Sequence, residues 1–553
     1  MRVRWLGRVK YRDALALQHA LFEHAHDDYL LMLEHHHVFT YGASADLTTN
    51  LKCDPQSVGA ELVRVNRGGD ITYHGPGQLV VYPIRSLPGK HGDASPADVT
   101  AYVCSVEQLI IDTLAVLGIN AGRKSGYPGV WIDADTPRAR KICAIGVRVA
   151  RGSTARRTMH GFALNVDTDL RYMREHIVPC GIAEHPVTSL REEGCNASLR
   201  EVADIVARLA SERWGSGVSD QLGSGVNDRH DVAWDYEPDV VGMNIAQRKP
   251  EWLRPKVEHG ADVLATKKTL RDLHLVTVCE EAGCPNLSEC WKDGTATFMV
   301  LGERCTRACG FCLVDTRKPE RPDADEPQRV AEAVARMGLS HAVLTMVARD
   351  DLEDGGFEHV ARCVQAIRTR KPGTAVETLV SDAKGDDVSL EKLFAVRPEV
   401  FNHNIETVAR LQRIVRPSAG YARSLSVLAR AKRVGLVTKS GFMLGLGETT
   451  EEVESLLADL AAVGVQIVTI GQYLRPSADH LPVVRWAAPD EFAHYRTVGE
   501  SLGISHVESS PLTRSSYHAR EAADAATNGA EGVSVHSSGV GVSATEVKVL
   551  VRR

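Results

Sequence analysis

The sequence predicts an α/β protein with more than one domain. Its 553 residues exceed what one hydrophobic core usually organises, because domains average about 150 residues. Between residues 340 and 472, apolar runs of strand length alternate with helical patterns, as in the βα units of a parallel sheet. Residues 215–226 are rich in Gly and Ser, a composition typical of flexible linkers. We therefore expect a first domain over 1–214, a linker over 215–235 and a second domain over 236–522.

Individual elements follow from apolar spacing. In the first half, residues 79–84 have the length of a strand, and residues 103–117 repeat apolar side chains at helical spacing. Asp98 is of the residue type that starts a helix. In the second half, the predicted strands are 342–345, 375–380, 436–441 and 466–471, and the predicted helices are 357–370 and 450–463. From Ala523 the chain is rich in Ala, Gly and Ser, which predicts a disordered tail over 523–553.

Composition limits the class of function. An apolar content of 43% and a charged content of 25% are ordinary for a soluble protein. The net charge of −6 argues against nucleic acid as a partner. No run of about 18 apolar residues occurs, so we expect no membrane partner. The first ten residues lack the features of a signal or transit peptide, which predicts a cytoplasmic, reducing location suited to free thiols.

Six of the twelve cysteines fall within residues 279–312, in two groups of three. The second group, Cys305, Cys309 and Cys312, has the spacing C-x3-C-x2-C. A [4Fe–4S] cluster held by three thiolates keeps one iron open for another ligand. Structural zinc usually takes four ligands from C-x2-C pairs, and disulfide frameworks belong to short secreted chains. The spacing therefore favours iron–sulfur chemistry over zinc or disulfides.

Around these cysteines, the second half carries a dense, ordered set of motifs. They are Lys249-Pro-Glu-Trp-Leu-Arg, Cys279-x4-Cys-x5-Cys, Arg349-Asp-Asp-Leu-Glu-Asp-Gly-Gly, Asn402-His-Asn-Ile-Glu-Thr-Val, Thr438-Lys-Ser-Gly-Phe-Met-Leu-Gly, Gly471-Gln-Tyr-Leu-Arg-Pro-Ser and Arg514-Ser-Ser-Tyr. From about residue 248 to 520 this half resembles lipoyl synthase, a radical S-adenosylmethionine (SAM) family. Met346 and Ala348 depart from the family pattern. The resemblance implies a partial (β/α) TIM-type barrel of the radical SAM type.

The resemblance also implies two [4Fe–4S] clusters. Cys305, Cys309 and Cys312 would hold the cluster whose open iron binds SAM, with an electron donor such as ferredoxin or flavodoxin. An auxiliary cluster, the source of the two sulfurs inserted at C6 and C8 of an octanoyl chain, would have four protein ligands: Cys279, Cys284, Cys290 and Ser515. An ordinary turn hydroxyl is the alternative for Ser515.

Further residues are predicted to contact the cofactor. Gly355 and Gly356 lack a Cβ and would let the backbone approach SAM closely. Glu406, Arg416 and Lys439 would bind SAM or an intermediate, with a surface or structural ion pair as the alternative. A structural metal module is the alternative for the whole second half.

The first half has its own ordered motifs. They are Arg67-Gly-Gly-Asp-Ile-Thr-Tyr-His-Gly-Pro-Gly-Gln, Lys141-Ile-Cys-Ala-Ile-Gly-Val, His160-Gly-Phe-Ala-Leu-Asn-Val and Ile177-Val-Pro-Cys-Gly-Ile. Over about residues 10–205 they resemble octanoyltransferase, which implies the α+β fold of lipoate and biotin protein ligases. The resemblance implies Cys180 as the nucleophile that takes the acyl group as a thioester. Lys141 would stabilise its thiolate and act as general base for the entering amine.

The same resemblance implies the residues that line the acyl tunnel and its mouth. They are Arg67, Gly68, Gly69, Asp70, Ile71, Thr72, Tyr73, His74, Ala144, Ile145, Gly146, Gly161, Phe162 and Ala163. The family pattern is broken at residues 34–37, where three histidines indicate a solvated loop rather than a metal site. Cys143 is interpreted as a packing residue. The remaining cysteines are interpreted as structural: Cys53, Cys104, Cys195 and Cys363.

Together the two halves predict a bifunctional enzyme of lipoate biosynthesis. The first would move octanoyl from acyl carrier protein to a lysine of lipoyl domains in 2-oxoacid dehydrogenases and of the glycine cleavage H protein. The second would then insert two sulfurs into the attached chain. The alternatives for the first half are an ATP-dependent lipoate or biotin ligase and a non-catalytic module that docks the acceptor.

Overall fold

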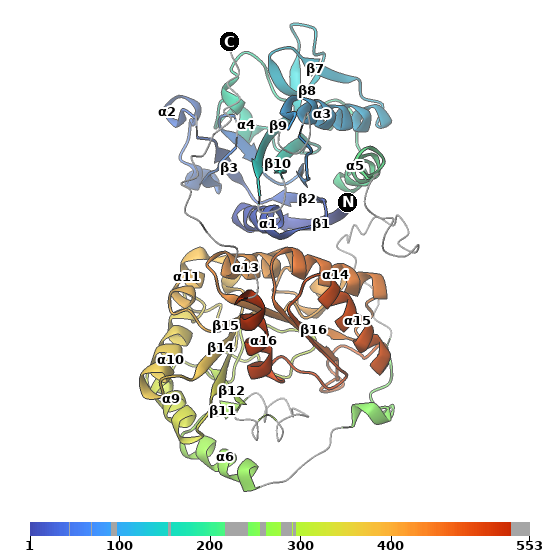
Figure 1. The fold of residues 1–553 in the computed structure, drawn as a ribbon. Coiled ribbons are helices and arrows are strands. Elements are labelled where there is room, and N and C mark those ends of the chain that lie inside the picture. The colour runs from blue at the N-terminus through green and yellow to red at the C-terminus, as the bar shows by residue number, and fades with distance from the viewer. Residues whose placement is uncertain are drawn as a thin grey trace. The chain divides into compact units, whose positions relative to one another are not determined.

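The computed structural model describes residues 1–43, 45–67, 69–89, 97–152, 156–215, 242–254, 261–277, 290 and 295–531. These residues form two compact units. Unit 1 contains the described residues up to 215, and unit 2 contains those from 242 onward. Figure 1 shows the elements of both units.

Unit 1 is built on a seven-stranded sheet. Its order is β1 (Arg2–Val9), β2 (Tyr29–His35), β6 (Gln78–Ile84), β10 (Arg156–Asn165), β9 (Arg140–Arg151), β8 (Tyr127–Ile132) and β7 (Ala121–Lys124). Only β1 and β2 pair in parallel; the other neighbours are antiparallel. A second sheet has the order β4 (Glu61–Arg64), β3 (Val38–Tyr41) and β5 (Thr72–His74). The helices are α1 (Tyr11–His24), α2 (Leu47–Asn50), α3 (Val99–Val116), α4 (Arg171–Arg174) and α5 (Leu199–Trp214).

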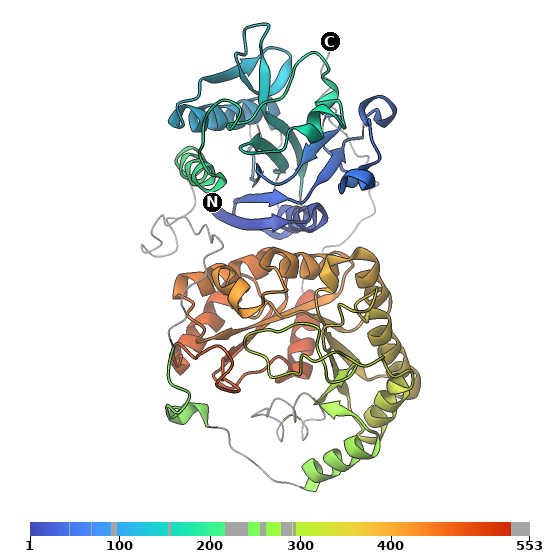
Figure 2. The same cartoon turned by 180° about the vertical axis from the view of Figure 1, so that it is seen from behind.

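The two faces of the seven-stranded sheet differ in character. One face packs against α3 and α5 in an apolar core that includes Met32, Val81, Leu109 and Val206. The predicted strand 79–84 is confirmed as β6, and the predicted helix is confirmed as α3, whose first turn is capped by Asp98. Because strand side chains alternate, the other face carries His35 of β2 and Tyr82 of β6. Figure 2 shows the ribbon of this unit from behind.

One described helix, α3, is long and apolar enough to cross a membrane by length and composition. The sequence had led us to expect no such segment. In the structure α3 contributes Val106, Leu109, Ile110 and Leu114 to the apolar core of unit 1.

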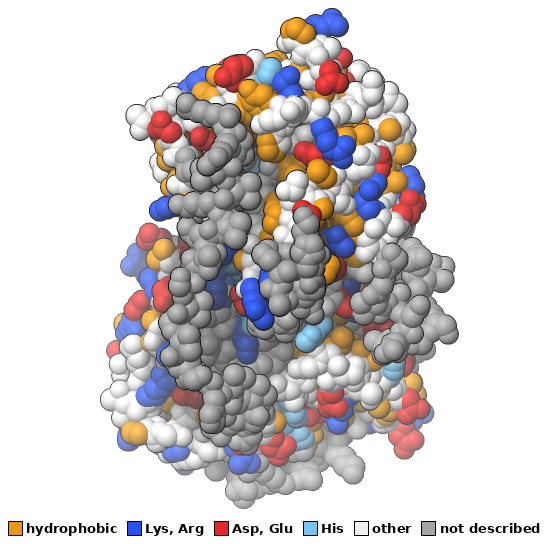
Figure 3. Space-filling view, turned by 45° about the horizontal axis from the view of Figure 1, so that its top comes forward, with side chains coloured by type: hydrophobic (Ala, Val, Ile, Leu, Met, Phe, Trp, Pro, Cys, Tyr) orange, Lys and Arg blue, Asp and Glu red, His pale blue; other side chains and the backbone are white. Residues whose placement is uncertain are grey.

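The charged side chains on the surface are mixed in sign. On the face drawn in Figure 3, Lys and Arg side chains are interspersed with Asp and Glu rather than gathered into one basic area.

Unit 2 contains an eight-stranded sheet in sequential order. The strands are β11 (Val276–Thr277), β12 (Thr295–Val300), β13 (His341–Met346), β14 (Ala375–Leu379), β15 (Val400–Asn402), β16 (Val437–Leu444), β17 (Ile467–Gln472) and β18 (His506–Ser509). All neighbours from β12 to β18 are parallel, and β11 is antiparallel to β12. Within the described residues no pairing joins β18 back to β12, so the barrel is partial, as expected.

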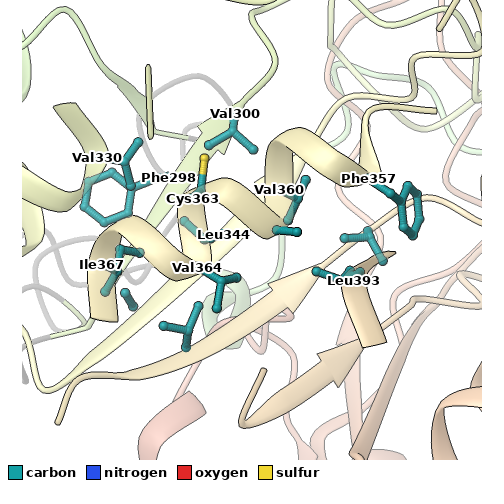
Figure 4. Packing of buried hydrophobic residues seen from close by; sticks show 14 of the residues in the cluster. Phe298, Val300, Val330, Leu344, Phe357, Val360, Cys363, Val364, Ile367 and Leu393 are labelled. Atoms are coloured by element: carbon teal, nitrogen blue, oxygen red, sulfur yellow. The ribbon is translucent and has the colours of Figure 1, made fainter. Parts of the chain in front are cut away.

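Helix α6 precedes the sheet, and the other helices lie between its parallel strands. These helices are α6 (Ala261–Asp272), α9 (Glu326–Arg336), α10 (Phe357–Arg370), α11 (Asp387–Ala395), α12 (Gln412–Val415), α13 (Tyr421–Arg433), α14 (Thr450–Ala462) and α15 (Pro489–Ser501). The predicted helices 357–370 and 450–463 are confirmed as α10 and α14. Figure 4 shows Val360, Cys363 and Val364 of α10 packed in a buried apolar cluster with Phe298 and Leu344. This core lies between the sheet and its outer helices.

The last described helix, α16 (Ala519–Glu531), corrects the predicted tail. Its Ala522 and Ala526 pack against Val400 and Ile467. Val400 lies on the strand face opposite to Phe401, which packs in the outer core, so α16 covers the inner face of the barrel. Figure 1 shows α16 in the middle of unit 2, with α10, α11, α13 and α14 around it. The small Ala side chains, which the sequence led us to interpret as disorder, let this helix approach the strands closely. Residues 532–553 of the predicted tail lie outside the described residues.

Candidate functional sites

Cys180 lies on a tight turn against the glycine-rich loop of unit 1. It is half-buried, and its backbone is left-handed with φ 57°. Its N–H donates to the carbonyl oxygen of Ile71 at 2.8 Å. A Cβ added to Gly181 would meet the Asp70 carboxylate at 3.1 Å, so the turn and the loop are in contact. A left-handed cysteine costs roughly 1–2 kcal/mol, which indicates that the position of this thiol is constrained.

Lys141 reaches the polar face of the sheet through a bulge. The pairing of β8 with β9 shifts between Val130 and Trp131, so Lys141 is opposite Trp131 while Cys143 is opposite Val130. The extra residue turns Lys141 away from the core in which Cys143 packs. The Lys141 side chain is buried, and its Nζ lies 4.8 Å from the centre of the Trp131 ring, a cation–π geometry.

The chain that follows Cys180 returns to Lys141. The N–H of Lys141 donates to the carbonyl of Pro186, and the N–H of Thr188 donates to the carbonyl of Lys141, each at 2.9 Å. The described contact of Nζ is to Trp131 rather than to Cys180. The structure therefore brings the predicted pair onto neighbouring segments. Cys143 is fully buried and burial raises the pKa of its thiol, in agreement with a packing role.

Arg67 is a second cation near Cys180. Its guanidinium donates to the carbonyl of Asp70 at 2.9 Å and to the carbonyl of Thr40 at 2.8 Å. Burial lowers the pKa of Arg67, while the facing Tyr11 hydroxyl and Cys180 thiol act in the opposite direction. Sequence reasoning placed Arg67 among the acyl-binding residues and missed its charge beside the thiol. The sequence does show this charge, because Arg67 is the first residue of the glycine-rich motif. The packing of the Cys180 turn against that loop is seen in the structure.

Two buried imidazoles, His74 and His160, lie near this cation, and a third, His35, lies against His74. Burial lowers the pKa of His35 to about 3, of His74 to about 4 and of His160 to about 3. His35 contacts the Tyr82 hydroxyl through Nε2 at 2.8 Å, and its ring centre lies 5.7 Å from that of His74. All three are neutral at pH 7, so they offer hydrogen bonds without further charge.

The solvated loop predicted at residues 34–37 is therefore wrong for His35. This residue ends β2 and is fully buried, whereas His36 is exposed. The alternation of β2 directs His35 to the polar face of the sheet. Within the described residues no group of three His, Cys, Asp or Glu side chains is arranged to hold a metal ion, and this applies to the three histidines as well as to Cys305, Cys309 and Cys312.

The predicted tunnel residues fall into separate environments. Ile71 and Tyr73 are fully buried in a small core with Phe39 and Ile177. Ile145 and Phe162 are opposite each other on β9 and β10 and face the α3–α5 core.

The remaining predicted positions are small or lie in the loop. Gly146 pairs with Gly161 and Ala144 with Ala163, and the two alanines are on the sheet face opposite to the α3–α5 core. A Cβ at Gly161 would be 2.1 Å from the Val81 carbonyl oxygen, so only glycine fits there. Gly69 and Thr72 belong to the loop and β5, and Gly68 lies outside the described residues.

In unit 2, the three-cysteine loop follows β12. The thiol sulfur of Cys305 accepts hydrogen bonds from the backbone N–H of Arg307 at 3.4 Å and of Ala348 at 3.3 Å. Burial raises the pKa of Cys309 to about 12; Arg416 opposes this rise, and the nearby Cys312 and Cys305 thiols contribute to it. The three thiols therefore lie near one another, although they are not closed into a metal-binding group in this structure. Neighbouring thiols with amide donors fit the expected cluster, since binding to iron removes their protons.

A buried charge network fixes this loop. Arg307 donates two hydrogen bonds to Asp350, at 2.8 and 2.9 Å, and one to Asp382 at 2.6 Å. Although burial opposes it, Arg307 and Arg423 hold the pKa of Asp382 well below its usual range. These residues were missed by sequence reasoning, although Asp350 belongs to a motif that was recognised. Their side chains connect the loops after β12, β13 and β14.

The predicted SAM-binding glycines precede α10. Gly355 and Gly356 have φ of 63° and 88°. A Cβ at Gly356 would be 2.5 Å from the Leu301 side chain, so this glycine permits close packing on Leu301. At Gly355 the nearest atom to an added Cβ is 3.8 Å away, in Ala383.

The three predicted charged contacts differ in surroundings. Glu406 is close to Arg416 and to the Cys309 and Cys312 thiols; burial raises the pKa of its carboxyl, and Arg416 opposes this. Arg416 is buried and donates to the Ile405 carbonyl at 3.2 Å. Both therefore lie by the cysteine loop.

Lys439 lies deeper, inside the barrel. Lys439 and Glu377 are fully buried, and Nζ is 3.1 Å from the carboxylate. Asn402 donates to the same carboxylate at 2.7 Å. This is the structural ion pair that the sequence left open as the alternative, and a cofactor contact of Lys439 stays a prediction.

Of the predicted auxiliary ligands, Ser515 and Cys290 are described and both are half-buried. The Ser515 hydroxyl accepts a hydrogen bond from Asn404 Nδ2 at 2.6 Å. Asn404 is two residues from Glu406, which places Ser515 on the same edge of the barrel as the three-cysteine loop. Cys279 and Cys284 lie outside the described residues.

Comparisons with known proteins identify a family for each half of the chain. Residues 299–460 match the radical SAM superfamily, and residues 197–284 match the N-terminal domain of lipoyl synthase. The lipoyl synthase of Rubrobacter xylanophilus is 54% identical over 286 residues, which cover 51% of this chain and 89% of that protein. The chain belongs to the lipoyl synthase family. The lipoyl synthase of Chlorobaculum parvum is 53% identical over 49% of this chain and 94% of its own length.

Unit 1 carries a second catalytic domain. Residues 10–210 match the lipoyl protein ligase A/B catalytic domain. A bi-partite lipoate protein ligase from Thermoplasma acidophilum is 20% identical, covering 38% of this chain and 82% of that one, with a TM-score of 0.32. The chain therefore joins a ligase- or transferase-type catalytic domain to a radical SAM sulfurtransferase, both serving lipoate biosynthesis. The family implies SAM, iron–sulfur chemistry and lipoyl-domain proteins as acceptors.

Proposed function

We propose that the chain performs two consecutive reactions on one acceptor lysine. Unit 1 moves an octanoyl group from acyl carrier protein to a lysine of a lipoyl domain or of the glycine cleavage H protein. Unit 2 then inserts two sulfurs at C6 and C8 of the attached chain. The observation that carries the proposal is the half-buried Cys180 thiol on its left-handed turn, with Arg67 and Lys141 on neighbouring segments.

In the first reaction the Cys180 thiolate attacks the octanoyl thioester carbonyl. The bond from Cys180 sulfur to the acyl carbon forms, and the thiolate of the carrier leaves. The lysine amine of the acceptor then attacks the new thioester, an amide forms, and Cys180 regains its thiolate. Arg67 stabilises the anionic sulfur. Lys141 gives its proton to the departing carrier thiolate and, once neutral, takes the proton that the acceptor amine gives up. The neutral His74 and His160 donate hydrogen bonds near the acyl carbonyl.

In the second reaction, unit 2 binds and orients its reactants. A [4Fe–4S] cluster at Cys305, Cys309 and Cys312 would supply the electron that cleaves SAM, and an auxiliary cluster at Cys279, Cys284, Cys290 and Ser515 would supply sulfur. The amide donors to Cys305 and the Arg307–Asp350–Asp382 network hold the thiols in place. Glu406 and Arg416 present charge for the polar groups of SAM. Ferredoxin or flavodoxin is the proposed electron donor.

We place both reactions in the cytoplasm, where reduced thiols persist, without a nucleic-acid or membrane partner. The acyl group stays on a mobile lysine arm, so the second reaction needs no tunnel from the first. Joining the two domains gives the acceptor an effective concentration of about millimolar at the second site. A chase with unlabelled octanoyl acceptor measures this: retained label supports direct transfer, and complete dilution excludes it.

An ATP-dependent ligase is the second candidate for unit 1, because the matching catalytic domain includes ligases. The full chain, incubated with octanoyl-carrier protein and no ATP, is expected to gain the mass of one octanoyl group on Cys180. Cys180→Ala is expected to abolish that adduct and the transfer to lysine. Activity that persists in Cys180→Ala and requires ATP would establish the ligase, and binding of acceptor with no chemistry would establish a docking module.

A further inference from the structure

Two buried lysines of the chain are held in different ways. Lys439 of unit 2 is fully buried, and its Nζ lies 3.1 Å from the Glu377 carboxylate, which accepts a hydrogen bond and balances the charge. Lys141 of unit 1 is 6% exposed, and among the described residues its Nζ has no hydrogen-bond or ion-pair partner. The Trp131 ring centre lies 4.8 Å from this Nζ instead. A buried ammonium without a carboxylate is costly, so its surroundings have to support it.

A bulge in β8 places the ring beside this lysine. The register of β8 on β9 shifts between Val130 and Trp131, and Trp131 is then opposite Lys141. Gly129 precedes the shift with φ 119°, and a Cβ there would be 2.5 Å from the Cys143 carbonyl oxygen and 3.5 Å from Lys141 Cε. The first distance is too short for any side chain, so this position requires glycine. The bulge therefore makes the ring and the ammonium neighbours across two strands.

The orientation of the Trp131 ring is itself fixed. The ring is fully buried, and its Nε1–H donates to the carbonyl oxygen of Tyr127 at 3.1 Å. The His185 ring centre lies 5.5 Å from that of Trp131, at an interplanar angle of 80°. His185 belongs to the segment that leads from the Cys180 turn back to Lys141. One ring thus contacts both the predicted base and the chain that follows the predicted nucleophile.

An aromatic ring holds an ammonium differently from a carboxylate. The ring attracts the charge through the negative face of its π system and leaves the three N–H groups without a conventional acceptor. The Glu377 carboxylate, in contrast, accepts a hydrogen bond from Lys439 and forms an ion pair with it. In the proposed function, Lys141 gives up and takes a proton in each cycle. A ring partner holds its Nζ and keeps the N–H groups available to the reacting atoms.

We propose that Trp131 is a positioning residue whose ring holds the Lys141 ammonium in place for octanoyl transfer. The inference rests on the proposed function, in which Lys141 moves the protons of both steps. Trp131 acts through Lys141 rather than on the octanoyl group. A cation–π contact at a desolvated site corresponds to a factor of about 30 in an equilibrium constant, so weakening it should slow the transfer by about tenfold.

The test changes the electrostatics of the ring and keeps its shape. Tryptophan analogues with one to four ring fluorines, introduced at position 131 alone in the full chain, weaken the negative face of the ring stepwise. The matched control is the same series at Trp214, where the Arg85 guanidinium also lies 4.8 Å from the ring centre. Octanoyl transfer from carrier protein to a lipoyl domain, followed by acceptor mass, gives kcat and KM. Protection of the buried Cys143 thiol from labelling shows that unit 1 remains folded.

At position 131, kcat is expected to fall with each added fluorine, to about a tenth of the parent value with four, while KM stays the same. A ring that only packs would not respond, because fluorine barely changes its size. The series at position 214 is expected to have no effect. In a Lys141→Met background, the residual transfer should be equal with tryptophan and with its tetrafluoro analogue at position 131, because the cation is absent.

Two kinds of result would overturn different statements. If fluorination at position 131 leaves kcat unchanged, or lowers it no more than at position 214, while Lys141→Met has lost transfer, the positioning role of Trp131 is wrong and the proposed function stands. If folded Lys141→Met transfers octanoyl at the parent rate, the role of Lys141 within the proposed function is wrong.

Discussion

The two units place their reactive groups by different structural means. In unit 2 the site residues follow the carboxyl ends of successive parallel strands: Cys305 to Cys312 after β12, Asp350 after β13, Asp382 after β14, Asn404 and Glu406 after β15, and Ser515 after β18. In unit 1, Cys180 and His160 have positive φ, and Lys141 depends on a bulge. A parallel sheet brings such segments to one edge by topology alone. A mostly antiparallel sheet has no such common edge and uses local irregularities instead.

The units also differ in how they manage buried charge. Unit 2 pairs its buried charges, in the Arg307–Asp350–Asp382 network and in the Lys439–Glu377 pair. Unit 1 places Arg67 near His74 and His160, two imidazoles that burial keeps neutral. The first arrangement resists pH change but is sensitive to loss of one partner. The second is sensitive to acid.

The sharpest test of this division is a reciprocal pair of substitutions. Cys309→Ala is expected to lower reductive cleavage of SAM by more than about 10³-fold and to leave octanoyl transfer unchanged, because removal of an essential ligand or nucleophile abolishes chemistry. Cys180→Ala is expected to do the reverse. Deoxyadenosine formation and acceptor mass measure the two reactions. A loss of both activities in either variant would show that the units do not work separately.

Acid should unfold unit 1 before unit 2. The pKa values of His35, His74 and His160 are lowered to about 3–4 in the fold, against about 6.5 unfolded. The unfolded chain therefore binds protons that the folded unit does not bind. As a result, the free energy of unfolding of unit 1, which is fully present above pH 6.5, decreases as the pH falls below that value. From pH 7 to 5, each imidazole removes about 2 kcal/mol, or about 6 kcal/mol for the three. In unit 2, His403, whose pKa is lowered to about 4, removes about 2 kcal/mol.

Two buried thiols report on this difference within one molecule. Cys143 lies in the core of unit 1 and Cys363 in that of unit 2, and both are fully buried. Urea titrations at pH 7 and pH 5, read by dithiodipyridine labelling at each cysteine, give the stability of each unit. His35→Gln should reduce the pH-dependent loss of unit 1 by about 2 kcal/mol. Equal losses in both units would contradict the prediction.

Breaking the buried ion pair should destabilise unit 2 by less than this acid effect. Lys439→Met leaves the Glu377 carboxylate buried without its partner, which is expected to cost about 3–5 kcal/mol. Replacing both, with Lys439→Met and Glu377→Leu, should recover most of that stability. Arg171→Ala, which breaks an exposed ion pair with Asp169 in unit 1, serves as a control with no measurable effect expected. If the double variant is stable but no longer binds SAM, Lys439 contacts the cofactor as the sequence predicted.

The smallest expected effects concern helix starts. Asp98 caps α3 in unit 1 with one hydrogen bond to the Ala101 N–H, whereas Thr449 forms a reciprocal capping box with Glu452 at the start of α14 in unit 2. Asp98→Ala and Thr449→Ala are each expected to cost about 1 kcal/mol in their own unit. Denaturation read at Cys143 and Cys363 assigns each loss. A loss registered in the wrong unit would contradict the local nature of the caps.

Much of unit 2 could be predicted from the sequence because its signals are local. Strand and helix periodicity gave α10 and α14, and the cysteine spacing pointed to the metal chemistry. The sequence did not predict the structure correctly where one local pattern is compatible with two different conformations. The Ala-rich segment at 519–531 is equally compatible with a disordered tail, and only its contact with Val400 and Ile467 decides for a helix.

The sequence alone determined which residue types are present for each reaction and roughly where the repeating elements lie, because periodicity and motif spacing are short-range properties. Tertiary structure decided the rest: that His35 is buried, that a bulge turns Lys141 away from Cys143, that Lys439 pairs with Glu377, and that Asn404 meets Ser515 across 111 residues. These facts depend on sheet register and on contacts between distant segments. Neither is encoded in any short stretch of chain.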